Sequence, residues 1–163
     1  MPRRELKSGR QVLEWLDELS LRLQLPGQLI LIGSAALLWH AEQRGIATEL
    51  PEASMDVDAL TDSDEIADAC YDCLIGSEFE RTNGWHVNLM PNAVLRELPS
   101  DWRTRAASMP VGLLTVVVPQ PADLLAPKLR RGEPRDQRHY DWAARIGLVS
   151  SEPKCNQSEV TEP

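Results

Sequence analysis

Residues 29–40 read LILIGSAALLWH, and this stretch sets the first strand and the central helix of the fold. The apolar run predicts a buried strand over residues 28–32, and the alanines and leucines after Ser34 predict a helix that ends near Gly45. A glycine at such a junction lets a ligand approach the backbone, and the first N–H groups of a helix favour an anion. Gly33 and Ser34 therefore form a candidate phosphate site, unless the pair is only a turn into the helix.

Residues 54–60 read SMDVDAL and follow after a loop. Apolar and acidic residues alternate here with period two, so a strand over residues 55–60 carries Asp56 and Asp58 on one face. Two carboxylates in this arrangement can hold a hard divalent cation such as Mg²⁺, which prefers oxygen ligands and also takes substrate phosphates. The alternative is that they belong to the solvated face of an edge strand.

Length and composition limit what either site can belong to. A chain of 163 residues with 42% apolar residues suffices for one core, so we expect one domain over residues 1–149. Residues 150–163 are poor in apolar side chains, which predicts a disordered tail. Acidic residues exceed basic ones, 25 against 17, so any contact with nucleic acid must be local. Without a long apolar run, a secretion signal or a disulfide framework, the chain is expected in the cytoplasm with no membrane segment.

The remaining pattern predicts an α/β (α+β) fold in which helices flank a small mixed β-sheet and further helices close the chain. Ser8 and Gln11 have capping-box spacing before an amphipathic helix. The other expected elements are helices over residues 65–77, 121–131 and 135–146, short helical pieces over residues 93–98 and 102–107, and strands over residues 85–90 and 113–118. Pro127 should kink or interrupt its helix.

The clearest basic cluster of this acidic chain lies in the last two predicted helices and comprises Lys128, Arg130, Arg131, Arg135 and Arg138. Such a cluster is either a solvated helix surface or a binding site for phosphate or RNA, and both interpretations stay open. Cys70 and Cys73 fall on the apolar stripe of a predicted helix without a second ligand pair, which favours buried packing over zinc binding.

The order of these motifs resembles the nucleotidyltransferases of the DNA polymerase beta superfamily, in which an apolar strand ends in Gly-Gly or Gly-Ser and a later strand carries Asp-x-Asp. The chain looks most similar to the small bacterial nucleotidyltransferases of abortive-infection and type IV toxin–antitoxin systems. The likeness covers roughly residues 28–149 and includes a basic segment with Arg103 and Arg105. Its C-terminal part matches at Pro121, Asp123, Leu124, Lys128, Arg135, Asp136 and Asp141.

The resemblance implies a nucleotidyltransferase-like fold and an enzyme that transfers a nucleoside monophosphate from an NTP to an acceptor such as tRNA or a protein. Gly33 and Ser34 would hold the triphosphate. Lys128, the third catalytic residue beside the two aspartates, would contact it as a point charge, with Arg135 as a second cation. The two aspartates would bind Mg²⁺, which neutralises charge on the phosphates and on the leaving pyrophosphate. As a toxin, the protein would have a cognate antitoxin as partner.

Two positions depart from the superfamily pattern. Asn88 stands where the next strand usually supplies a third carboxylate, which ligates the metal and helps to deprotonate the acceptor. Either the alignment is shifted by a strand, or Asp123, Asp136 or His86 takes that role. Glu52 stands where related toxins often carry an arginine. Three hypotheses follow: an active nucleotidyltransferase, a degenerate one that serves as a binding or antitoxin-like protein, and an unrelated α/β interaction module.

Overall fold

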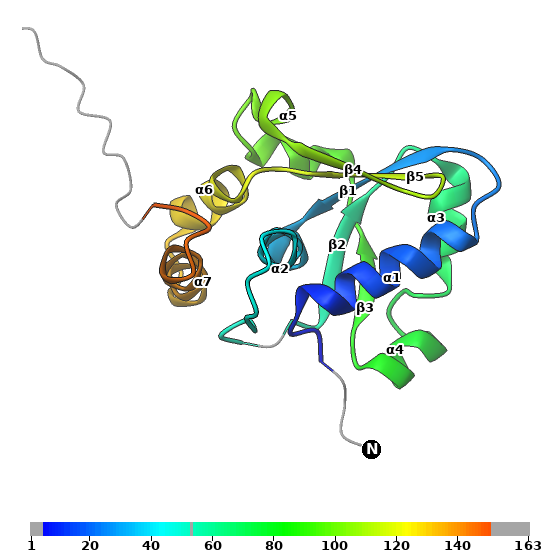
Figure 1. The fold of residues 1–163 in the computed structure, drawn as a ribbon, viewed down its shortest axis with the longest axis horizontal. Helices are drawn as coiled ribbons and strands as arrows, with labels where there is room; N and C mark the ends of the chain where they lie inside the picture. The colour runs from blue at the N-terminus through cyan, green and yellow to red at the C-terminus, as the bar shows by residue number, and fades with distance from the viewer. Residues whose placement is uncertain (1–4, 53, 151–163) are drawn as a thin grey trace, which may run out of the picture.

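The computed structural model describes residues 5–52 and 54–150. Figure 1 shows a sheet with helices packed around it and a pair of helices at the end of the described chain. In chain order the elements are α1 (Gly9–Leu21), β1 (Gly27–Ile32), α2 (Gly33–Gln43), β2 (Asp56–Leu60), α3 (Asp64–Tyr71), α4 (Glu78–Asn83), β3 (His86–Leu89), the 3₁₀ helix η1 (Asn92–Glu97), α5 (Trp102–Arg105), β4 (Ala107–Val111), β5 (Leu114–Val118), α6 (Pro121–Arg131) and α7 (Pro134–Arg145).

The sheet is mixed, with strand order β3-β2-β1-β5-β4. The central strand β1 runs antiparallel to β2 and parallel to β5, while β2 and β3 run parallel. The register places Ile32 opposite Asp58 and Asp58 opposite Asn88. The end of β1 and the acidic strand therefore meet at the centre of the sheet. The predicted small mixed sheet with flanking and C-terminal helices is confirmed.

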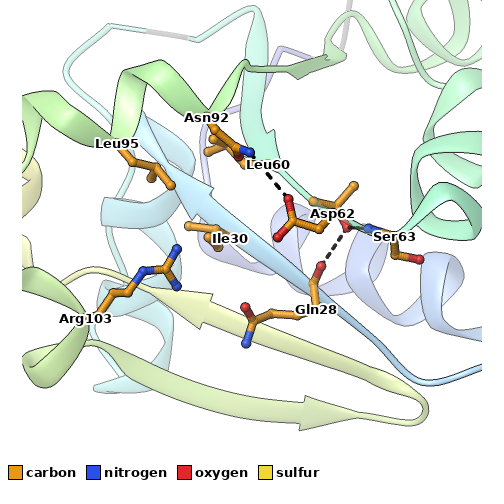
Figure 2. Close-up of a pocket in the computed structure, with 9 residues that line it drawn as sticks. Gln28, Ile30, Leu60, Asp62, Ser63, Asn92, Leu95 and Arg103 are labelled. Carbon is orange, nitrogen blue, oxygen red and sulfur yellow. Dashed lines mark hydrogen bonds between the residues drawn. The ribbon is translucent and has the colours of Figure 1, made fainter.

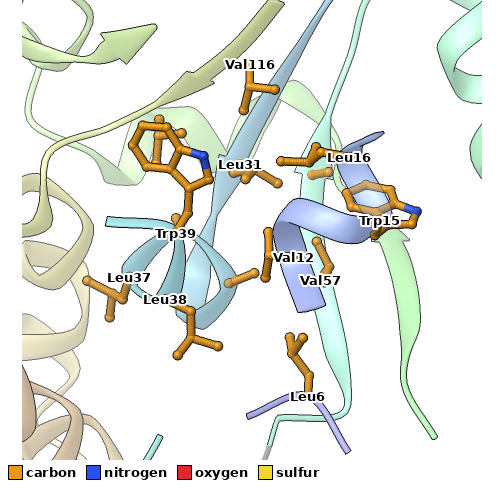
Figure 3. Packing of buried hydrophobic residues seen from close by; sticks show 14 of the residues in the cluster. Leu6, Val12, Trp15, Leu16, Leu31, Leu37, Leu38, Trp39, Val57 and Val116 are labelled. Atoms are coloured by element: carbon orange, nitrogen blue, oxygen red, sulfur yellow. The ribbon is translucent and has the colours of Figure 1, made fainter. Parts of the chain in front are cut away.

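One face of the sheet is covered by α1 and α2. Figure 3 shows side chains of these helices packed against the strands, among them Leu16 of α1, Leu38 of α2 and Val57 of β2. The capping-box prediction is confirmed, because the Gln11 side chain accepts the Ser8 N–H at 3.2 Å. Burial of this apolar layer stabilises the fold at about 25 cal/mol per Å².

The opposite face of the sheet is covered only in part. Ile30, Leu60 and Val117 form a second apolar cluster with Trp102 of α5, and side chains of η1 pack against it. Since alternate residues of a strand share a face, Asp56 and Asp58 lie on this same face as Leu60. Both aspartates are only partly buried. The partial cover thus leaves the acidic pair accessible to a ligand.

Several details of the chain differ from the sequence predictions. The helix expected over residues 65–77 ends as α3 at Tyr71, so Cys73 lies beyond it, although both Cys70 and Cys73 are buried as expected. Strand β4 was not predicted. It contains Pro110 and lies at the sheet edge, where a proline is tolerated. Helix α4 was also missed, although Ser77 and Glu80 have N-cap spacing and the Ser77 hydroxyl accepts the Glu80 N–H. The expected interruption at Pro127 is wrong: α6 continues to Arg131, held by the buried Leu124 and Leu125.

Two predictions about the chain as a whole, the disordered tail and the single domain, are not tested by the described residues. The predicted disordered tail falls mainly on residues 151–163, which lie outside the described residues, so it stays a prediction, as does the single domain. Across residues 5–52 and 54–150, no helix is long and apolar enough to cross a bilayer.

Candidate functional site

The junction between β1 and α2 places the backbone directly against the acidic strand. Gly33 has a φ of +67°, a conformation that L side chains rarely adopt. A Cβ atom at this position would lie 2.9 Å from Asp58 Oδ2. Glycine is therefore required twice over, by its φ and by the approach of Asp58. Ser34 follows at the second position of α2 and is partly buried.

The second part of the site is the pair of carboxylates on β2. Asp58 accepts a hydrogen bond from Asn88 Nδ2 at 3.1 Å. Burial, and then the neighbouring Asp56 carboxylate, raise the pKa of Asp58, while the Asn88 hydrogen bond and the Lys128 charge oppose that rise. The two aspartates thus repel each other in a partly dry environment, which a bound cation would relieve.

Strand β3 supplies a histidine and an amide next to the aspartates. The parallel register pairs His86 with Asp56 and Asn88 with Asp58. His86 Nδ1 lies 2.7 Å from Glu80 Oε2 of α4, and Glu80 Oε1 accepts the Gly76 N–H at 3.1 Å. Glu80 thus lies against one nitrogen of the imidazole, and Nε2 is the other ring nitrogen.

Lys128 of α6 approaches the same site from the C-terminal helices. Its Nζ lies 3.0 Å from His139 Nδ1 and 3.9 Å from Asp136 Oδ1. An ammonium group only donates, so His139 Nδ1 accepts and the ring proton resides on Nε2. Burial, and then the Lys128 and Arg135 charges, lower the pKa of His139 to about 4. The ammonium of Lys128 is therefore held by a neutral ring.

The carboxylate nearest to Lys128 is already occupied. Arg131 forms two hydrogen bonds to the buried Asp136, at 2.9 and 3.3 Å. Burial lowers the pKa of Lys128, and the Asp136 charge opposes this. Because Arg131 takes up the charge of Asp136, the positive charge of Lys128 stays available to an anion.

A cavity of about 280 Å³ lies on the partly covered face of the sheet, and the predicted residues Ser34 and Asp56 are not part of its lining. Its lining comprises Ile32, Gly33, Asp58, Met90, Val94, Glu97, Leu98, Leu124, Pro127, Lys128 and Arg131. We call this cavity the phosphate pocket, after the phosphate site that the sequence predicts at Gly33. The structure thus brings together Gly33, Asp58 and Lys128, three residues that lie on three separate elements.

Other predicted site residues lie outside the phosphate pocket. Arg135, expected as a second cation for the triphosphate, lies with its Nε 3.8 Å from Glu52 Oε2, and Arg138 also pairs with Glu52. Asp123 is buried and receives two hydrogen bonds from Arg105, at 2.8 and 3.0 Å. Asp123 therefore joins α6 to α5 and is not free to replace the third carboxylate.

A family model describes residues 7–151 as a nucleotidyltransferase of unknown function (DUF6036). The chain belongs to this nucleotidyltransferase family. No curated protein and no solved structure matches the chain at a significant level. The family supports nucleotidyl transfer as the general reaction class and an NTP as substrate. The toxin–antitoxin resemblance is not covered by this match and stays a prediction.

In this member of the nucleotidyltransferase family, Asn88 and the aspartates considered as a third carboxylate all have partners of their own. Asn88 pairs with Asp58 in the sheet register, so the strand after the acidic strand places an amide beside this aspartate. Asp136 is engaged by Arg131, as Asp123 is by Arg105. Within the described ranges, no group of three or more His, Cys, Asp or Glu side chains is arranged to hold a metal ion.

Sequence reasoning missed Glu80 and gave no role to His139. Glu80 lies on a short helix that was not predicted, and its capping-box spacing to Ser77 was the signal that could have revealed it. His139 is 1% exposed and reaches Lys128 because α6 packs on α7. A histidine eleven residues after a lysine carries no pattern that predicts this contact.

Proposed function

We propose that the protein transfers a nucleotidyl group from an NTP to a hydroxyl acceptor on tRNA or protein, with Mg²⁺ bound by Asp56 and Asp58. The observation that carries this proposal is the convergence of Gly33, Asp58 and Lys128 on one cavity. A glycine beside a helix N-terminus, a carboxylate and a lysine are the groups that triphosphate transfer needs.

In this proposal some residues of the chain bind the phosphates and others stabilise their charge. Gly33 brings the backbone of the first turn of α2 to the cavity, and Ser34 adds a hydroxyl at the same turn. Lys128 stabilises negative charge on the phosphates, and its contact with neutral His139 takes up none of the positive charge of the ammonium.

The donor set of β2 fits Mg²⁺. Magnesium usually binds one or two carboxylates and completes its coordination with water and substrate phosphates. Among the described residues no third acidic or histidine ligand joins the two carboxylates, and such a pair suits an ion that arrives with the nucleotide. When bound, the ion neutralises charge on the phosphates.

Deprotonation of the acceptor needs a base other than Asn88, and we assign it to His86. His86 shares the face of the aspartates, and the contact with Glu80 holds its ring. The Nε2 atom can accept the acceptor proton while Glu80 stabilises the imidazolium that forms. His86→Gln is expected to retain NTP binding and to lose transfer.

The test is incubation of the purified chain with Mg²⁺ and each α-labelled NTP, with total tRNA and whole-cell protein as acceptors. Label transferred by the wild type and lost in the Asp56→Asn, Asp58→Asn double variant supports the proposal. The matched control is Asp17→Asn with Asp68→Asn, which removes two exposed carboxylates elsewhere. Transfer that survives loss of the β2 carboxylates contradicts the proposed metal site.

A second candidate function is a degenerate nucleotidyltransferase that binds NTP without turnover, in a binding or antitoxin-like role. Asn88 favours it, because an amide cannot accept the acceptor proton. Calorimetry separates the two: NTP binding without any labelled product supports the degenerate protein. An unrelated interaction module predicts neither binding nor transfer.

The biological setting follows from the resemblance alone. Action as the toxin of a toxin–antitoxin system, with a cognate antitoxin and a cytoplasmic location, is proposed on that ground. Growth arrest on expression of the wild type, absent with the β2 double variant, is the expected result.

A further inference from the structure

A second cavity, of about 300 Å³, lies next to the phosphate pocket and has a different lining. Figure 2 shows Ile30 at its floor, with Arg103 and Asp62 on opposite sides. We propose that this cavity binds the base of a nucleoside; the proposal rests on the proposed nucleotidyl transfer and assigns a second part of the substrate.

The two cavities lie one after the other along strands β1 and β2. Ile32 and Asp58 line the phosphate pocket, and Ile30 and Leu60 line the second cavity. Residues two apart on a strand share a face and are separated by about 7 Å. In the register of the two strands, Ile32 is opposite Asp58 and Ile30 is opposite Leu60, so each cavity is lined by one pair of opposite residues. In a nucleoside phosphate one sugar separates the phosphate from the base, and this separation is similar to the spacing between the two cavities.

The 3₁₀ helix η1 covers both cavities at once. Val94 lines the phosphate pocket, while Asn92 and Leu95 line the second cavity. One element therefore links the two linings, as expected when one ligand occupies both. Leu95, Ile30 and Leu60 provide an apolar surface for the flat face of a base.

The polar lining offers both hydrogen-bond donors and an acceptor. Arg103 is exposed and stacks on the ring of the buried Trp102, with Cζ 4.7 Å from the ring centroid. Across the described ranges, the Arg103 guanidinium forms no ion pair with a carboxylate. Asp62 accepts, and Gln28 both donates and accepts. The Arg103 cation and the Asp62 carboxylate together suit a neutral heterocycle with a polar edge. The stacking on Trp102 orients the Arg103 side chain before a ligand binds.

The experiment compares Arg103→Ala with wild type by calorimetry, using inorganic tripolyphosphate and each of the four NTPs with Mg²⁺. Tripolyphosphate can occupy the phosphate pocket but has no base. We expect the wild type to bind at least one NTP more tightly than tripolyphosphate. Arg103→Ala should weaken that NTP by about tenfold to a hundredfold and leave tripolyphosphate binding unchanged. The control Arg96→Ala removes an exposed arginine of η1 that lines neither cavity.

The outcomes separate this inference from the proposed function. If Arg103→Ala leaves NTP binding unchanged but raises the KM for an RNA acceptor, the base comes from the acceptor, and the cavity is still a base site. If the variant changes neither, or if NTP and tripolyphosphate bind equally to wild type, the base site is overturned while the phosphate pocket stands. If neither ligand binds to wild type, the proposed function fails and this inference fails with it.

Discussion

Replacing Gly33 by alanine tests the contact on which the site is built. The left-handed φ of +67° costs an alanine about 1–2 kcal/mol. The new Cβ would also lie 2.9 Å from Asp58 Oδ2, closer than real Cβ contacts, so the carboxylate must turn away. Turning it breaks the hydrogen bond from Asn88, which adds about 1 kcal/mol. We expect Gly33→Ala to lower the free energy of unfolding by about 2–3 kcal/mol.

Gly45 offers a matched control for the backbone part of this cost. Its φ is +69°, and a Cβ atom there would meet no atom within 4 Å. Gly45→Ala should therefore lose only the conformational cost of about 1–2 kcal/mol. Any change in the entropy of the unfolded chain is the same for both variants, so their difference isolates the contact with Asp58.

The measurement is urea unfolding of both variants, combined with NTP titration in the presence of Mg²⁺. A double-mutant cycle with Asp58→Ala completes it: without the carboxylate, Gly33→Ala should cost no more than Gly45→Ala. Only Gly33→Ala should weaken NTP binding. Equal losses for the two alanine variants, with no coupling to Asp58 and unchanged NTP binding, would refute the reasoning.

Three further predictions concern buried titratable groups. Arg105→Ala should lower the urea midpoint more than Asp123→Asn. Loss of Arg105 leaves the buried Asp123 carboxylate without its partner, whereas loss of the Asp123 charge leaves only an exposed guanidinium. Equal midpoints for the two variants would contradict this. Burial raises the pKa of Cys70 to about 12, so iodoacetamide at pH 8 should label Cys70 in urea but not in the native chain, as read by peptide mass spectrometry. Burial lowers the pKa of His139 to about 4. As the pH falls from 6.5 to 4, the unfolded chain therefore binds a proton at His139 that the folded chain does not, and the free energy of unfolding should decrease. His139→Gln should flatten that fall in urea unfolding measured at pH 7.5, 6 and 5, and an unchanged slope would exclude His139 as its cause.

Local pattern predicted the central part of the site. The change from strand to helix at Gly33 and the alternation around Asp58 depend on residues only a few positions apart, so both could be predicted from the sequence. The same local rules did not predict β4, a strand that contains Pro110. The position of β4 at the sheet edge, which a local rule cannot see, made that proline acceptable.

The contacts across the site could not be predicted in this way. The hydrogen bond between Asn88 and Asp58 joins residues thirty positions apart, and it depends on the register between β2 and β3. The Lys128 contact with His139 depends on how α6 packs against α7. Such pairings are decided by the burial of whole faces, to which every residue of a strand or helix contributes.

The sequence by itself determined the strand-to-helix junction at Gly33, the acidic face of β2 and, through the order of the motifs, the nucleotidyltransferase family, because each is written in short-range pattern. Only the tertiary structure decided which groups meet at the candidate site and which pair elsewhere: it brought Lys128 to Asp58, engaged Asp123 with Arg105, and set His86 against Glu80. The physical reason is that strand order, register and helix packing follow from long-range burial of apolar surface, and a charged side chain takes whichever partner that packing leaves beside it.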